Sequence, residues 1–105
     1  MIEINIFSHT GDFAEDKDLA RNLRLNKIAP TLKDGQEIIL NFENVSLATQ
    51  SFIHALISEL IRSNGIEVLD KISFKSCNNS VKAIINVVVD YMQDVVFESD
   101  DDTTT

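Results

Sequence analysis

The sequence contains few of the residues that mark several protein classes. Its 105 residues include three glycines, one proline, one cysteine and no tryptophan. So little glycine and proline excludes collagen-like and linker-like chains, and it leaves no glycine-rich loop for binding nucleotide phosphates. Cys77 alone cannot form an internal disulfide bond, which fits a reducing compartment. No apolar run approaches the roughly 20 residues of a membrane span, and the start MIEINIF lacks a signal peptide's basic residues, so we expect a cytoplasmic protein with no membrane association.

Basic residues are also scarce, and the net charge is −8. Much of this charge lies in residues 98–105, ESDDDTTT, which have no apolar side chain to anchor them. We therefore predict one domain at 1–97 and a disordered acidic tail at 98–105. The shortage of clustered lysine and arginine argues against nucleic-acid binding.

Hydrophobic periodicity predicts strands that alternate with helices. Strands are expected at 2–7, 37–42 and 72–75, and the mostly apolar run at 37–42 suggests a central strand that is buried on both faces. Helical spacing is expected at 17–33, at 50–64 and from residue 79 onward. Strands separated by helices imply crossover connections, so the predicted fold class is α/β, a central mostly parallel sheet with helices packed against it.

Local signals predict where the helices begin and end. Pro30 should end one helix near Ile28 and open a short second turn. Asp12 and Glu15 have the spacing of a capping box that would start that helix, and Thr49 is a suitable N-cap for the helix after it.

The segment 37–60, EIILNFENVSLATQSFIHALISEL, combines a buried strand, a short loop and a capped helix. Together with the rest of the chain from about 19 to 91, it resembles the STAS-like domains of unassigned function, which are related to the STAS domains of anti-sigma factor antagonists. The matching residues are Ala20, Arg21, Leu23, Arg24, Gly35, Asn41, Phe42, Val45, Thr49, Ser51, Phe52, Gly65, Ile72 and Phe74. The resemblance implies a small STAS-like domain that acts by protein binding, and its expected partner is a histidine-kinase-like ATPase or a serine kinase.

The start of this helix departs from the related antagonists, and Asn41 stands in place of an aspartate of the family pattern. They are phosphorylated on a serine at the start of this helix, and a helix N-terminus does favour a phosphate. Gln50 occupies that position here, Thr49 stands where they carry aspartate, and Ser51 matches the second serine of the pair. Because Gln50 has no hydroxyl group, we predict constitutive partner binding without this phosphorylation switch.

The candidate partner-binding residues form two groups. Around the loop and the start of the helix they are Val45, Thr49, Gln50, Ser51 and Phe52. On the preceding helix they are Arg21 and Arg24, whose three-residue spacing puts them near one face for contact with an acidic partner. Helix capping by Thr49 and Ser51, and a solvated face for the two arginines, are the structural alternatives.

Two other functions stay open. The chain is an obligate subunit of a larger assembly, for example in phage defence, or a small enzyme that uses His9 and Asp12 beside Ser8. We expect no enzyme activity, no cofactor and no metal, because the two histidines have no cysteine or histidine neighbour at metal-ligand spacing. A homo-oligomer is compatible with all three functions.

Overall fold

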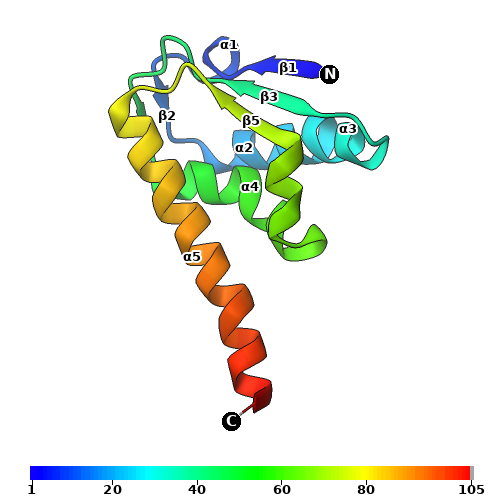
Figure 1. Cartoon of the computed structure of the whole chain (residues 1–105). Coiled ribbons are helices and arrows are strands. Elements are labelled where there is room, and N and C mark those ends of the chain that lie inside the picture. The colour runs from blue at the N-terminus through cyan, green and yellow to red at the C-terminus, as the bar shows by residue number, and fades with distance from the viewer. Residues whose placement is uncertain (105) are drawn as a thin grey trace.

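A computed structural model describes the backbone of residues 1–104 and the side chains of residues 1–93. The main sheet has three strands, and Figure 1 shows the longer helices gathered on one side of it. The strands are β1 (Ile2–Asn5), β3 (Ile38–Asn41) and β5 (Ile72–Lys75), and both neighbouring pairs are parallel in the order β1-β3-β5. The predicted small α/β fold with a parallel sheet is therefore confirmed.

Helical segments connect these strands, and all but the short α1 pack beneath the sheet. They are α1 (Phe7–Thr10), α2 (Lys17–Leu23), the π-helical stretch η1 (Arg24–Ile28), α3 (Ala29–Lys33), α4 (Gln50–Asn64), the 3-10 helix η2 (Ile66–Lys71) and α5 (Asn79–Thr104). The expected acidic tail at 98–105 falls on residues whose side chains lie outside the described part of the chain. Its disorder stays a prediction.

The core forms between the lower face of the sheet and the apolar stripes of α4 and α5. Every apolar residue that the helical spacing selects on α4 is buried: Phe52, Ile53, Leu56, Ile57, Leu60 and Ile61. From the sheet, Ile38 and Leu40 of β3 are fully buried against them. Full burial of each such side chain stabilises the fold by about 1.5–3 kcal/mol, so the helical stripes hold the domain together.

The upper face of the sheet is more open than the lower one. Ile39 of β3 is half-buried there and Asn41 is buried, while Glu3 and Ser73, the register neighbours of Ile39, are exposed. No residue of β3 is exposed, so the expected central strand is covered on both faces, less completely on the upper one. Both crossovers leave the sheet on the same side, so no helix covers the other face in the described part of the chain.

Pro30 does not break the helix. The segments α2, η1 and α3 follow each other without a gap, and the N–H of Ala29 donates to the carbonyl of Arg24, five residues earlier. A proline ring collides with the carbonyl four residues before it, and one wide π-turn relieves that collision while the helix continues. The predicted end near Ile28 is wrong for this reason.

The ends of this helical segment are capped by local signals. Asp16 is the N-cap, because its Oδ1 accepts from the N–H groups of Asp18 at 2.9 Å and Leu19 at 3.2 Å. The capping box expected from Asp12 and Glu15 is therefore wrong. At the other end, Gly35 has a φ of 81° and donates its N–H to the carbonyl of Leu32, which is typical of a glycine that ends a helix.

Candidate functional site

A second, very small sheet brings the starts of α2 and α4 together. β2 (Phe13–Ala14) pairs in parallel with β4 (Leu47–Ala48), and the N–H of Thr49 donates to the carbonyl of Ala14 at 2.9 Å. Each strand leads directly into the N-terminus of one helix. Strands of two residues are too short to show a period in the sequence, so both segments were expected to be loops. The pairing nevertheless determines which residues of α2 and α4 become neighbours.

The start of α4 is held by its cap and by two buried anchors. Thr49 Oγ1 accepts from the N–H of Phe52 at 3.1 Å, so the predicted N-cap is confirmed. Val45 and Phe52 are buried in the core, which means that they position this segment and do not face a partner. Gln50 and Ser51 are exposed on the first turn of the helix. Of the five residues expected here, these two present the most accessible side chains.

A cleft of about 400 Å³ lies between the first turns of α2 and α4. It is lined by Lys17, Gln50, Ser51, His54 and Ala55. Lys17 brings one positive charge to the cleft beside the start of α4, where the N–H groups of the helix N-terminus also favour an anion. Its residues come from two helices whose first residues, Lys17 and Gln50, are 33 positions apart in the sequence. This neighbourhood was not predicted, although Lys17 precedes Arg21 by one helical turn and the two therefore share a face.

Arg21 and Arg24 have different environments. Arg24 is half-buried, and its Nη1 donates to the carbonyl of Ala55 at 2.8 Å, which joins the helical segment of α2 and η1 to α4. Arg21 is exposed, and no carboxylate lies within ion-pair distance of it among the described residues. The pair predicted as one contact surface is thus one structural arginine and one available arginine. We call Lys17, Arg21, Gln50, Ser51 and His54 the α2–α4 face.

Exposed apolar side chains lie next to this face. Phe13 and Leu47 are opposite each other in the β2–β4 pair and are 43% and 50% exposed. Asn78 fixes the loop that carries Leu47, because its Nδ2 donates to the carbonyl of Ser46 at 2.9 Å while its Oδ1 accepts from the N–H of Val81 at the start of α5. A rigid apolar pair beside a cationic cleft is a combination typical of protein-binding surfaces.

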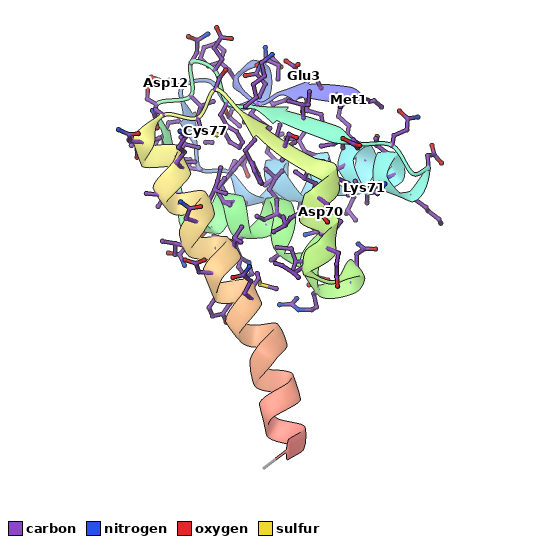
Figure 2. All side chains as sticks on the ribbon, in the orientation of Figure 1. Met1, Glu3, Asp12, Asp70, Lys71 and Cys77 are labelled. Carbon is purple, nitrogen blue, oxygen red and sulfur yellow. The ribbon has the colours of Figure 1, made fainter. Side chains whose placement is uncertain are left out.

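A polar cluster forms at the opposite face, on the open side of the sheet. Asn41 Nδ2 donates to Glu3 Oε2 at 2.8 Å, and Lys75 Nζ lies 3.5 Å from Glu3 Oε1. Figure 2 shows Glu3 on the side of the sheet away from the helices. The hydrogen bond from Asn41, with a smaller contribution from Lys75, holds the pKa of Glu3 below its usual value against a weak opposing effect of burial. An aspartate at position 41 could not donate this bond.

The residues of the enzymatic alternative are not assembled. His9 lines a groove beside β1, whereas neither Asp12 nor Ser8 lines it, and Ser8 Oγ donates to the main-chain carbonyl of Asn5. Cys77 precedes α5, and burial raises the pKa of its thiol although Lys82 opposes the shift, so the thiol stays protonated at neutral pH. Within the described residues there is no group of histidine, cysteine and carboxylate side chains that could hold a metal ion.

Hydropathy along the helices completes this description. No helix, over the residues that the structure describes, combines the length and the apolar character needed to cross a bilayer.

Comparison with known proteins bears on the resemblance noted from the sequence. A family model described as a STAS-like domain of unknown function (DUF4325) matches residues 20–82. Searches of curated proteins and of solved structures gave no significant match. The matched region extends from α2 through β3, α4 and β5 to the start of α5, so it covers more than half of the chain and includes most of the α2–α4 face. The chain therefore belongs to the family of STAS-like domains of unknown function.

Proposed function

We propose that this chain is a non-enzymatic regulatory or scaffold module that acts by binding another protein through the α2–α4 face. The observation that carries the proposal is the first turn of α4. Gln50 and Ser51 are exposed there beside Lys17, while Thr49, Val45 and Phe52 hold the turn in place. A rigid, accessible turn requires little ordering when a partner binds, which favours affinity.

Charge and apolar area indicate the chemistry of the partner. Lys17 and Arg21 present two exposed cations on this face, so a local acidic patch on the partner would be attracted to it. Phe13 and Leu47 at its border supply apolar area to exclude water around the charged contacts. The resemblance to anti-sigma factor antagonists suggests a cytoplasmic histidine-kinase-like ATPase or serine kinase as the class of partner.

The uncharged Gln50 makes this binding constitutive. In the related antagonists a phosphate at this turn controls the interaction, and Gln50 cannot accept one. The side chain is permanently in the uncharged state, so a partner never meets the repulsion that a phosphate would introduce. If the partner is a kinase, incubation of the chain with this kinase and ATP should leave Ser51 unphosphorylated.

An obligate subunit of a larger assembly is the second candidate function. It is favoured by α5, where Val87 and Tyr91 are 47% and 54% exposed at helical spacing. His54 of the α2–α4 face lies beside Tyr91, with ring centroids 6.3 Å apart, so this apolar strip continues the same surface. A partner that covered both would bury a larger, more apolar interface of the kind found in permanent complexes.

Site-specific photo-cross-linking in the native cell tests the proposal. A photoreactive amino acid replaces Ser51 in one version of the chain and Gln36 in a control version, because Gln36 is also exposed but precedes β3 at the opposite end of the sheet. Position 51 should yield one discrete cross-linked protein that mass spectrometry identifies, and position 36 should not yield it. The same product from both positions, or from neither, contradicts an interface on the α2–α4 face.

A further inference from the structure

The outer edge of β1 is not paired. β1 is the edge strand of the sheet, and its N–H groups at Ile2 and Ile6 donate to the carbonyls of Glu37 and Asn41 beside β3. In a parallel pair, alternate residues direct their N–H and C=O groups toward the same neighbour, so Glu3 and Asn5 direct theirs outward. The outward N–H groups have no strand to pair with in the part of the chain that the structure describes.

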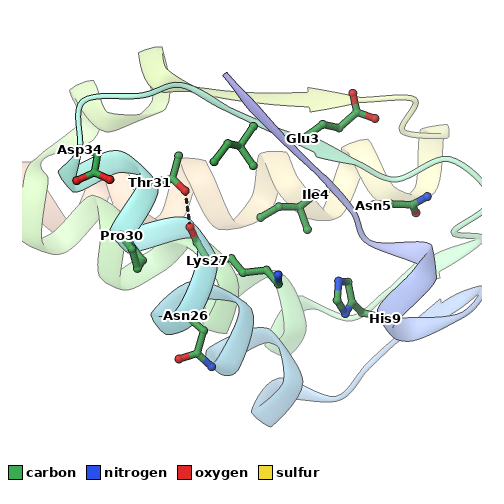
Figure 3. Close-up of a pocket in the computed structure, with 10 residues that line it drawn as sticks. Glu3, Ile4, Asn5, His9, Asn26, Lys27, Pro30, Thr31 and Asp34 are labelled. Carbon is green, nitrogen blue, oxygen red and sulfur yellow. Dashed lines mark hydrogen bonds between the residues drawn. The ribbon is translucent and has the colours of Figure 1, made fainter.

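A groove of about 360 Å³ follows this edge, as the close-up in Figure 3 shows. Its upper wall is the whole of β1, and its lower wall is the helical surface of η1 and α3 with Asn26, Lys27, Pro30 and Asp34. Ile2 is 40% exposed in this groove. The groove is therefore as long as the strand and has an apolar section beneath free main-chain groups.

The edge lacks three features that often prevent strand addition, although β1 is short and carries the charged Glu3. Natural edge strands carry lysine or proline or a bulge that prevents another chain from pairing. β1 reads Ile-Glu-Ile-Asn and contains no lysine or proline. Its register with β3 is continuous from Ile2 to Asn5, without a bulge. Main-chain pairing with a further strand is thus structurally available.

The two ends of the groove have opposite charge. Figure 3 shows Asp34 at one end and Lys27 beside His9 at the other. The helical segment runs back along β1, so Asp34 is next to the start of the strand and Lys27 is next to its end. Lys27 and Asp34 are seven helical residues apart, which corresponds to a rise of about 10 Å along the helix. In an extended strand, side chains at positions i and i+4 lie on the same face and are about 13 Å apart. Charges at positions i and i+4 of a bound strand can therefore reach both ends.

We propose that the outer edge of β1 binds an extended peptide segment of a partner protein as a fourth strand. Antiparallel pairing is the more stable arrangement, and it places the N-terminal end of the peptide next to Lys27. The recognised pattern is then an acidic residue, an apolar residue and a basic residue at alternate positions, with the apolar side chain over Ile2 and Pro30. Main-chain bonds to the N–H and C=O groups of Glu3 and to the N–H of Asn5, whose carbonyl already accepts from Ser8 Oγ, supply affinity, and the groove supplies specificity.

NMR titration of the isotope-labelled full chain tests this proposal with two synthetic peptides. The first is acetyl-Thr-Asp-Thr-Ile-Thr-Lys-Thr-amide, and the second exchanges its Asp and Lys. The first should shift signals of β1 and of Lys27 and slow the amide hydrogen exchange of Glu3 and Asn5 at least tenfold. It should bind at least about fivefold more tightly than the second peptide.

Two sets of variants separate main-chain pairing from charge. Glu3→Pro removes one outward N–H, which an edge strand tolerates, and should abolish binding, while the matched control Glu3→Gln retains the N–H and should bind as the wild type does. The double variant Lys27→Glu/Asp34→Lys should reverse the preference between the two peptides. Each variant is first shown by its NMR spectrum to be folded.

Other results would overturn the proposal. These are no binding of the first peptide at about 1 mM, binding that Glu3→Pro leaves unchanged, or signal shifts that lie away from β1. In the absence of peptide, the amide exchange of Glu3 and Asn5 could also slow as the protein concentration rises. That result would assign the edge to a second copy of the chain and would equally contradict a partner peptide.

Discussion

Replacement of Arg24 by methionine should destabilise the domain, whereas the same replacement of Arg21 should not. Arg24 Nη1 donates to the carbonyl of Ala55 across the α2–α4 contact, and Arg21 has no ion-pair partner among the described residues. Methionine keeps the unbranched stem and has a helix propensity close to that of arginine. The two variants therefore differ mainly in the loss of one charged hydrogen bond.

The expected cost follows from the environment of that bond. Hydrogen bonds to charged groups contribute about 1.5–3 kcal/mol. The carbonyl of Ala55 also belongs to the α4 ladder, so the substitution leaves no unpaired acceptor, and Arg24 is only half-buried. Both facts put the loss near the lower limit, at about 1–1.5 kcal/mol. For a domain of this size we expect a drop in melting temperature of about 4–10 °C.

Urea denaturation followed by circular dichroism measures this difference directly. Arg24→Met should lower the midpoint without changing the slope of the transition, and Arg21→Met should stay within about 0.5 kcal/mol of the wild type. Equal stability of the two variants would refute the assignment of Arg24 as the structural member of the pair. A larger loss in Arg21→Met would refute it as well.

Three further predictions concern the residues that position the two surfaces. Thr49→Ala should lower the free energy of unfolding by about 1 kcal/mol, because it removes the oxygen that accepts from the N–H of Phe52. Thr49→Ser keeps that oxygen and should be as stable as the wild type. Equal melting temperatures of the two variants would contradict the cap. Asn41→Asp should lower the melting temperature at neutral pH, because a second carboxylate replaces the donor to Glu3. Calorimetry should find a smaller difference from the wild type at pH 3. The lowered pKa of Glu3 implies a stabilisation that is present above the usual carboxyl pKa and is lost as the pH falls through the lowered pKa. The urea midpoint of Glu3→Gln should therefore change less with acid pH than that of the wild type. Parallel pH curves for the two proteins would contradict the hydrogen bond from Asn41 to Glu3.

The main helices and strands could be predicted from the sequence because each has a strong local signal. The stripe on α4 repeats over 15 residues, and Thr49 and Gly65 mark its ends, so periodicity and capping agree. The prediction failed where a tertiary effect outweighed a local one. At Pro30 the packing of Ile28 and Thr31 keeps the helix continuous, and the chain forms a π-turn instead of ending.

The candidate site was only partly predictable for a related reason. Gln50 and Ser51 could be selected from their place before an apolar helix, but the burial of Val45 and Phe52 depends on packing that no local pattern specifies. Lys17 joins the site because β2 pairs with β4, and each of these strands has only two residues. Such short pairings carry no periodic signal, so the sequence could not indicate that the starts of α2 and α4 lie together.

The affinity of the cross-linked partner for Gln50→Glu tests the central claim most directly. Isothermal titration calorimetry compares this variant with the wild type and with Gln36→Glu, which adds the same charge at the opposite end of the sheet. A carboxylate at the start of α4 is compatible with the fold, but it offsets the charge of Lys17 and faces an acidic partner. Gln50→Glu should bind at least about tenfold more weakly, a loss of about 1.4 kcal/mol, while Gln36→Glu should bind as the wild type does. Unchanged affinity of Gln50→Glu would contradict binding through the α2–α4 face.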